Sequence, residues 1–339
     1  MKKVLLPVTL LVSIVAVAQK QPDLHTPAEI LKIMDESKMQ YKIAQLDNAV
    51  KPADYSTRLN YNDVYRKITP DGFSTVKYSV TKEAEDEMEK AEAEFSKNNL
   101  DEARKHYIKS YEADSGFYMA LTYIGQTYGL QKDYVHAIEW YKKMISKNYI
   151  DYMAHWFLAD AYSFSGEKET ALQEIVIAHV LNRNNPRIMS SFKAILKENG
   201  LKLDEWVFAP QYTVKQNSDK SVDIKYADGW LSYALTKAIW AYEPGYRESM
   251  GYKDENIFRE LEEKECLLGM LVSDDKKTKA LDIRKALEKT TEDKDNNMIQ
   301  EFVFYEILLP QYPLAAYQFP DELIRAIGDY VLKVRCGKD

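Results

Sequence analysis

The feature that most restricts the fold of this chain is a repeat of 34 residues between positions 84 and 185. A fixed period of this length is typical of solenoids, in which each repeat is one supersecondary unit stacked on the next. One repeat position is alanine three times, at Ala103, Ala137 and Ala171. The segments around these alanines are LDEARKHYIKS (100–110), YVHAIEWYKKM (134–144) and KETALQEIVIA (168–178).

Each repeat is expected to form two helices joined by a short turn. In the second repeat, Asp133 lies where it can cap the start of the second helix. In the third repeat, Gly166 supplies a flexible corner. A single helix pair cannot bury its apolar face, so the pairs must stack. The repeats are 84–117, 118–151 and 152–185, and a helix at 186–199 is expected to cap the stack.

Small residues recur where helices would have to approach closely. Ala91, Gly125 and Ala159 share one repeat position, as the three alanines above share another. Two helices can pack at close range only where a side chain is nearly absent. The neighbouring space is expected to be filled by larger side chains at equivalent positions, Tyr107, Tyr141 and Ile175.

These residues resemble the tetratricopeptide repeat family over about 102 residues. The first repeat departs from the family pattern at Lys90 and Glu94, and the third carries His155 where Trp or Leu is common. The resemblance implies an α-α superhelix of helix pairs in a mostly α protein. The second repeat matches most clearly, with Leu121, Ile124, Gly125, Tyr128, Ala137 and Tyr141 at the signature positions.

The resemblance also implies a concave surface that is lined by the first helix of each repeat and binds a protein or peptide partner. In the family, a clamp of Lys, Arg and Asn binds a C-terminal carboxylate, and these positions hold none of the three here. A partner that presents a free C-terminal carboxylate is therefore disfavoured. Apolar and aromatic groups beside Glu and Asp would better suit an extended segment of basic or amphipathic character. Transferred position by position, the surface consists of Glu85, Met88, Glu92 and Phe95, of Met119, Thr122, Gln126 and Gly129, and of Met153, Trp156, Asp160 and Ser163.

Within this surface, we expect Trp156, Met119, Met153 and Phe95 to anchor the partner through apolar contacts. Glu92 and Asp160 would then set its charge preference. The alternative is that flanking segments of the same chain fill the surface, so that the repeats act only as a scaffold.

The N-terminus has the layout of a secretory signal peptide, residues 1–18. Lys2 and Lys3 precede an apolar run that ends at small residues, which predicts cleavage between Ala18 and Gln19. The alternative, a membrane anchor, would need roughly 20 apolar residues, and this run is shorter. We expect an exported, periplasmic or extracellular protein with no membrane span in the mature chain.

Charge and cysteine content limit the partners and the covalent structure. Loss of the two leader lysines changes the formal charge from -7 to -9, which argues against nucleic acid because phosphate binding needs a basic patch. Cys266 and Cys336 could form a disulfide in an exported protein, or they could remain separate thiols. The oligomeric state is left open.

The flanking regions carry weaker patterns. Residues 19–83 predict a helix from Thr26 to about Ile43, followed by a short strand near 73–80. Residues 200–339 predict a β-hairpin at 212–226 and a helical region. The helices there are expected at 229–242, 255–272, 275–290, 296–309 and 320–335.

Motifs for phosphate, dinucleotide or metal binding and for a catalytic nucleophile are missing from the sequence. We therefore expect a non-enzymatic protein without cofactor or metal. One alternative is a carboxylate-dependent hydrolase in the C-terminal region. Its first candidate is Glu306, since it lies within the apolar segment FVFYEILL, with Arg247, Arg325 and Arg335 as possible ion-pair partners. A second alternative is a glycan-binding surface, because the chain has 25 tyrosines.

Overall fold

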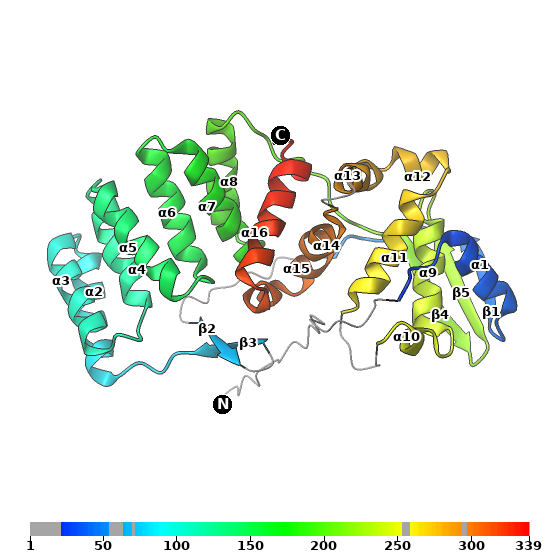
Figure 1. Ribbon diagram of the computed structural model, residues 1–339, viewed down its shortest axis with the longest axis horizontal. Coiled ribbons are helices and arrows are strands. Elements are labelled where there is room, and N and C mark those ends of the chain that lie inside the picture. The colour runs from blue at the N-terminus through cyan, green and yellow to red at the C-terminus, as the bar shows by residue number, and fades with distance from the viewer. Residues whose placement is uncertain (1–21, 54–63, 70–71, 253–257, 293–296, 339) are drawn as a thin grey trace. The chain divides into compact units, whose positions relative to one another are not determined.

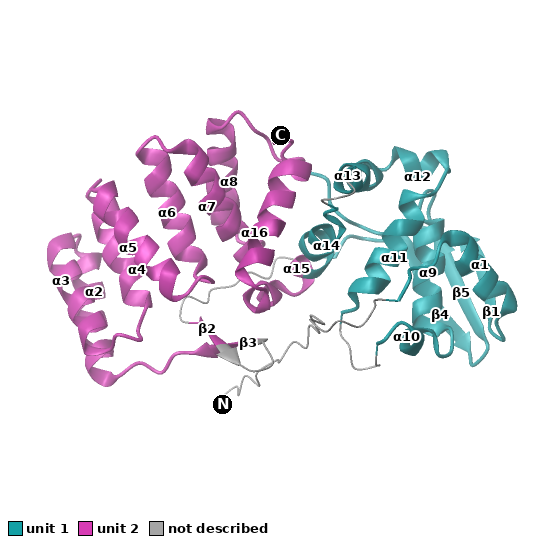
Figure 2. Ribbon diagram, viewed as in Figure 1, with its two compact units in different colours: residues 1–54, 205–308 teal, residues 55–204, 309–339 magenta. Residues whose placement is uncertain are grey.

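The computed structural model describes residues 22–53, 64–69, 72–252, 258–292 and 297–338. The expected signal peptide, 1–18, lies outside the described residues. The described part of the chain is mainly helical (Figure 1), which confirms the predicted mostly α fold class. It divides into two compact units, each assembled from two separate stretches of sequence (Figure 2).

Unit 2, within residues 55–204 and 309–339, contains the repeats. Each of the three repeats forms a pair of helices, and a seventh helix follows them (Figure 1). Every helix packs against the next one along the chain. The helices are α2 (Lys82–Ser96), α3 (Leu100–Ala113), α4 (Met119–Leu130), α5 (Tyr134–Lys147), α6 (Tyr152–Phe164), α7 (Lys168–Leu181) and α8 (Pro186–Glu198).

The close helix contacts expected at the small residues are present. A Cβ atom added to Gly125 of α4 would lie 2.5 Å from Cε1 of Tyr141 in α5, closer than carbon atoms can approach. The small residues at equivalent positions of the other pairs are also completely buried. Local sterics therefore set the distance between the two helices of a pair.

The turn between the two helices of a pair uses a left-handed residue at the same repeat position each time. The φ angles are 62° at Asn98, 64° at Lys132, 87° at Gly166 and 72° at Gly200. Glycine adopts this conformation without a steric penalty, whereas a lysine there is strained. Gly200 extends the pattern beyond the three repeats, which places α8 at the position of the first helix of a fourth repeat.

Exchanging residues at this turn position should change stability in opposite directions. The Gly166→Ala variant should lose about 1 kcal/mol of unfolding free energy, because nothing lies within 4 Å of the added Cβ and backbone strain alone acts. The Lys132→Gly variant should gain up to about 1 kcal/mol. Urea unfolding followed by circular dichroism measures both. An unchanged midpoint for Gly166→Ala would contradict the left-handed turn.

The last segment of the chain returns to cover the third repeat. It comprises α15 (Leu309–Gln311), the 3-10 helix η2 (Pro313–Gln318), α16 (Asp321–Tyr330) and the π-helical turn η3 (Val331–Arg335). Helix α16 packs against α7, where a Cβ on Gly328 would lie 3.2 Å from Val176. Because α8 and α16 both cover α7, every residue from Ile175 to Leu181 is buried.

A two-stranded hairpin, β2 (Val64–Thr69) and β3 (Gly72–Lys77), joins the repeats to the returning segment. The side chain of Asn148 at the end of α5 accepts a hydrogen bond from the Arg66 backbone N–H (3.3 Å) and donates one to Val64 O (3.1 Å). The Arg66 guanidinium donates to Phe319 O (2.6 Å) and pairs with Asp321. The sequence predicted β3 but missed its partner strand β2.

Unit 1 comprises the described part of residues 1–54 together with Glu205–Leu308. Its three-stranded sheet has the order β1-β5-β4, with β4 (Tyr212–Ser218) and β5 (Ser221–Tyr226) forming the predicted hairpin. The core lies between this sheet and α9 (Leu231–Tyr242). The other elements are α1 (Pro27–Glu36), β1 (Gln40–Gln45), α10 (Tyr246–Ser249), α11 (Glu260–Leu271), α12 (Lys276–Ala280), α13 (Asp282–Thr291), α14 (Ile299–Phe302) and the π-helical turn η1 (Val303–Leu308).

The predicted helix from Thr26 to Ile43 was wrong in its second half. Thr26 caps α1 as expected, but the helix ends at Glu36. Gln40–Gln45 instead forms β1, which pairs in parallel with β5, a strand about 180 residues further along the chain. Pairing with a distant strand outweighed the approximate helical spacing of Met34, Met39 and Ile43.

The units do not follow the contiguous boundaries expected from the sequence. Residues 205–308 of the expected C-terminal region, 200–339, form unit 1 with the N-terminal segment, whereas the described residues from Leu309 onward belong with the repeats. Cys266 and Cys336 are free, buried thiols, one in each unit, and the disulfide alternative is not realised. Burial raises the pKa of Cys336 to about 12, so this thiol stays protonated and unreactive at neutral pH.

Candidate functional site

The candidate site is the first-helix face, which we define as the residues at four equivalent positions of α2, α4 and α6. The 34-residue repeat places equivalent side chains on the same side of successive helices. Helices α4 and α6 contact each other directly, as do α6 and α8. The face consists of Glu85, Met88, Glu92, Phe95, Met119, Thr122, Gln126, Gly129, Met153, Trp156, Asp160 and Ser163.

Four apolar members of this face remain partly exposed after the helices have packed: Phe95, Met119, Met153 and Trp156. The indole N–H of Trp156 donates to Ser191 Oγ on α8 (2.9 Å), which fixes the ring on the surface of the next helix. Its ring centroid lies 5.4 Å from that of Phe157. The face therefore offers an oriented indole ring beside flexible thioether side chains.

Two predicted contact residues lie in the interior. Met88 is only 8% exposed and belongs to the core cluster that includes Leu121 and Ile124. Thr122 is 1% exposed. Their positions in the first and second repeats lie between packed helices. Met88 and Thr122 therefore support the face from the interior and are not part of its exposed surface.

The polar members of the face are mainly hydrogen-bond acceptors. Glu92 is exposed and accepts a hydrogen bond from the Tyr107 hydroxyl (2.6 Å). Ser163 donates to Glu198 on α8 (2.6 Å). Burial raises the pKa of Asp160 to about 6, and the negative charge of Glu198 adds to this rise. The face is thus acidic, and one of its acids is poorly solvated.

The chain's own flanking hairpin reaches the repeats at their connecting loops. The Tyr65 hydroxyl accepts a hydrogen bond from the Met119 backbone N–H (3.3 Å), and the Tyr65 ring lies 5.2 Å from that of Tyr118. The hairpin also contacts the repeats through Asn148, at the end of α5. These contacts cover the start of α4, which is one end of the first-helix face.

Unit 1 contains a dense buried polar network that the sequence did not predict. Lys237 of α9 pairs with Glu262 (2.9 Å) and Glu263 (2.5 Å) of α11, and the Tyr233 hydroxyl donates to Glu263 (2.6 Å). All three charged side chains are at most 11% exposed. Burial acts to raise the pKa of Glu262, but the cations Lys237 and Arg259 outweigh it and lower that pKa.

A second part of this network holds Glu265. One carboxylate oxygen accepts hydrogen bonds from Trp240 Nε1 (2.6 Å) and the Tyr246 hydroxyl (2.7 Å). The other accepts from the His25 backbone N–H (2.6 Å) and lies 3.0 Å from His25 Nδ1. The signal in the sequence was ELEEKEC, a run of acids beside apolar residues. Each of these carboxylates has hydrogen-bond or ion-pair partners, so the network stabilises unit 1.

Glu306, the candidate for hydrolase chemistry, lies in η1 and is 4% exposed. Of its expected ion-pair partners, Arg325 pairs with Glu322 (3.3 Å) and Arg335 donates to Asp204 O (2.5 Å). Arg247 donates to Ala241 O (3.0 Å). Glu306 therefore lies in the interior of unit 1, among the apolar side chains of η1.

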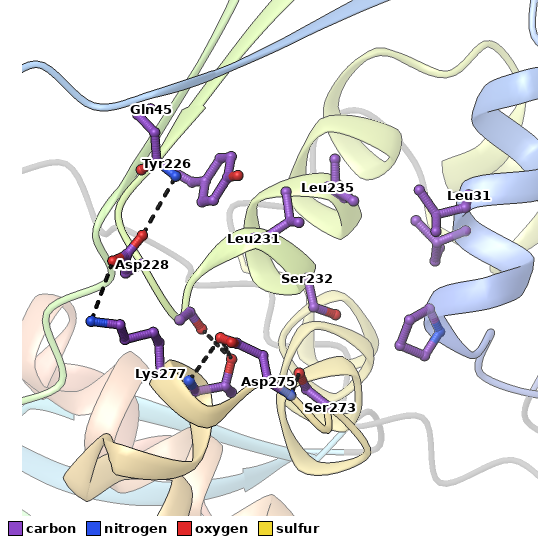
Figure 3. Close-up of a pocket in the computed structure, with 14 residues that line it drawn as sticks. Leu31, Gln45, Tyr226, Asp228, Leu231, Ser232, Leu235, Ser273, Asp275 and Lys277 are labelled. Atoms are coloured by element: carbon purple, nitrogen blue, oxygen red, sulfur yellow. Dashed lines mark hydrogen bonds and ion pairs between the residues drawn. The ribbon is translucent and has the colours of Figure 1, made fainter.

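An open pocket of about 310 Å³ in unit 1 is lined by α1, α9, α12 and the ends of β1 and β5 (Figure 3). Its walls include Leu31, Leu231 and Leu235. Its polar groups mostly bind one another, since Asp228 lies 3.5 Å from Gln45 and 3.7 Å from Lys277. Among the lining residues, the Ser232 hydroxyl is buried without a hydrogen-bond partner, and a single such group is fewer than a typical ligand site provides.

Other kinds of site find little support among the described residues. A glycan-binding surface would need several exposed aromatic rings side by side. The exposed ring of Phe164 stacks on the partly exposed ring of Tyr134, with the ring centroids 5.5 Å apart. The part of the chain that the structure describes contains no cluster of three or more potential metal ligands. None of its helices combines the length and apolar character that crossing a bilayer requires.

Comparison with known proteins adds distant structural similarities only. No family model matches the chain, and no curated protein matches it. The first TPR domain of Spaghetti (RPAP3), bound to an HSP90 peptide, is 20% identical, with a TM-score of 0.34, and covers 36% of this chain and 97% of its own. The Arabidopsis OM64 TPR domain is 15% identical, with a TM-score of 0.33, and the match covers 34% of this chain and 96% of that domain. YrrB, a TPR protein with an unusual peptide-binding site, is 14% identical, with a TM-score of 0.31, and the match covers 70% of this chain and 88% of YrrB.

Proposed function

We propose that this protein is a non-enzymatic scaffold that binds an extended segment of a partner protein on the first-helix face. The proposal needs no cofactor or metal, and it assigns no role to nucleic acid. Unit 1 would then serve as a folded module attached to the repeats.

The observation that carries the proposal is the row of partly exposed apolar side chains on successive first helices. Met119 of α4 and Met153 and Trp156 of α6 occupy equivalent or neighbouring repeat positions and retain exposed surface. Aromatic and methionine side chains at such positions are the typical anchors of protein interfaces, because they bury large apolar areas. Methionine also adapts its shape to different partners.

The charge of the face supports a neutral or basic partner segment. Glu85 and Glu92 are exposed acids on α2, and Asp160 and Glu198 add acidic groups on α6 and α8. A free C-terminal carboxylate would be repelled by these groups, since like charges in contact cost binding free energy.

Site-specific crosslinking tests this proposal. A photo-crosslinking amino acid at Met153 should capture a discrete partner in the native host. The same group at Glu139, an exposed position on α5, should not. Adding Trp156→Ala should reduce capture at Met153 by roughly tenfold, because an aromatic anchor contributes about 1–2 kcal/mol or more. Circular dichroism should remain unchanged. Equal capture at both positions, or no effect of Trp156→Ala, would exclude the face.

We further propose that the chain is exported and cleaved after Ala18, which would place the scaffold in the periplasm or outside the cell. The two lysines, apolar run and small residues of the leader support this. Mass spectrometry of the protein from its native host should find a mature N-terminus at Gln19. An intact Met1 on the cell-associated protein would contradict export by this route.

A further inference from the structure

Strand β1 forms an open edge of the sheet in unit 1. It is the last strand in the order β4-β5-β1, and among the described residues no strand pairs with its outer side (Figure 1). All of its residues except Tyr41 are exposed. An uncovered edge presents unpaired backbone N–H and C=O groups, which can pair with a strand from another molecule.

The opposite edge of the same sheet is protected. Strand β4 carries a bulge between Gln216 and Ser218, and Lys215 lies beside it. Bulges and lysines are common means of preventing edge pairing. Strand β1 keeps an unbroken register with β5 over its full length, and its lysine, Lys42, lies opposite Asp223 of β5. The edge formed by β1 is therefore regular and open.

The hydrogen bonds to β5 show which backbone groups face outward. Gln40 N–H donates to Lys220 O (2.7 Å), and Leu46 N–H donates to Tyr226 O (2.9 Å). Successive residues of a strand direct their N–H and C=O groups to alternate sides, so the even-numbered residues of β1 face β5. The outward-facing residues are Tyr41, Ile43 and Gln45. No described residue forms a backbone hydrogen bond with these outward groups.

An apolar row crosses the sheet and ends at this edge. Val214 of β4, Ile224 of β5 and Ile43 of β1 lie in register, so their side chains are on the same face of the sheet. Ile224 is completely buried, whereas Ile43 is 47% exposed. The row therefore lacks a neighbour on the outer side of Ile43.

We propose that β1 pairs in antiparallel orientation with β1 of a second copy of this chain, about a two-fold axis at Ile43. In this register Ile43 lies opposite Ile43 of the second copy, and Tyr41 lies opposite Gln45. Each outward-facing residue then exchanges two backbone hydrogen bonds with the residue opposite. Lys42 lies opposite Ala44, so the pairing places no like charges directly opposite each other.

The edge is thus self-complementary, as a two-fold interface requires. The pairing would join the two three-stranded sheets into one, and the apolar row would continue through both copies. A strand pair alone is smaller than a standard interface of about 1,600 Å², so the dimer should be reversible, with a dissociation constant on the order of 100 µM. The inference is independent of the first-helix face, although a dimer would carry two such faces and could bind a partner with two segments more tightly.

Sedimentation equilibrium of the full chain, over about 1 to 1,000 µM, tests the pairing. The native protein should change from monomer to dimer across this range. Ile43→Lys and Ile43→Glu should each weaken association by roughly tenfold or more, because like charges would meet at the axis. An equimolar mixture of the two variants should associate again. The control Val76→Lys changes a similarly exposed apolar residue of β3, in unit 2, and should dimerise as the native protein does.

Disulfide crosslinking tests the register. Ile43→Cys should form a covalent dimer under mild oxidation, because opposing Cα atoms would lie about 5.5 Å apart. Gln40→Cys is exposed on the same strand but should not crosslink, since antiparallel pairing places the two copies of this position far apart. The native cysteines are buried and should not compete.

A native protein that stays monomeric at every concentration would overturn the proposal. Failure of the lysine and glutamate variants to associate when mixed, or equal crosslinking at positions 40 and 43, would also overturn it. Capture of a different protein by Ile43→Cys in the native host, in place of a second copy, would assign the edge to another partner and equally refute self-pairing. Circular dichroism of each variant should match that of the native protein.

Discussion

Replacing Lys237 by methionine is expected to lower the unfolding free energy by about 3–5 kcal/mol, the typical cost of leaving buried carboxylates without their cation. Lys237 lies between Glu262 and Glu263, and all three side chains are nearly inaccessible to water. Burial alone would lower the pKa of Lys237, but the two glutamates raise it well above its usual value. In the variant both glutamates must either stay charged in a poorly solvated site or take up protons.

The pH dependence of this loss follows from the same balance. In the native protein, the folded-state pKa of Glu262 is lowered, so its stabilisation is present above the unfolded pKa and is lost as pH falls through the folded value. Without Lys237, only Arg259 would oppose the effect of burial on Glu262, so the folded-state pKa of Glu262 should rise. The variant would then recover stability as pH falls from 7 toward 5, and its difference from the native protein would shrink.

Urea unfolding at pH 7 and pH 5 checks both expectations. The matched control is Lys225→Met, because Lys225 pairs with Asp47 (2.6 Å) in the same unit but at an exposed site. Removing an exposed pair of this kind should cost less than about 1 kcal/mol. Adding Glu262→Gln and Glu263→Gln to Lys237→Met should restore part of the stability. Equal losses for the two lysine variants would refute the buried network.

The second large effect is expected from a single methyl group at Gly125. The Gly125→Ala variant should lose about 2–3 kcal/mol, although alanine favours helix more than glycine by about 1 kcal/mol. The new Cβ would lie 2.5 Å and 2.8 Å from two ring carbons of Tyr141, which is itself 3% exposed and cannot move aside freely. Helices α4 and α5 would have to separate.

The same helix supplies the control for this experiment. Gly129→Ala, four residues later in α4, brings its Cβ no closer than 3.5 Å to Tyr141, an ordinary contact. This variant should leave stability unchanged or raise it by roughly 0.5 kcal/mol. Tyr141→Leu combined with Gly125→Ala should lose less than the sum of the two single losses, because the residues share one contact. Similar effects for both glycines would show that close packing at Gly125 does not set the helix spacing.

Only part of the candidate site could be predicted from the sequence. The 34-residue period placed Met119, Met153, Trp156 and Asp160 on first helices, and the resemblance to the tetratricopeptide repeat implied that these positions lie at the surface. It could not show that Met88 and Thr122 are buried, since this depends on how neighbouring helices cover each position. The unpaired Gln126 Oε1 and the hydrogen bond from the Trp156 indole to Ser191 could not be predicted from the sequence either, because hydrogen bonds depend on side-chain geometry.

The sequence by itself determined the helix pairs, their small-residue contacts and the turn inside each pair. These features depend on residues close together in the chain, so local sterics and a regular period are enough to specify them. Only the tertiary structure decided which distant segments join them. The pairing of β1 with β5, the return of α16 to α7 and the partners of Glu262 and Glu265 connect segments that share no period. Such contacts form because each segment leaves an apolar face or polar group unsatisfied, and its sequence does not specify which distant surface will cover it.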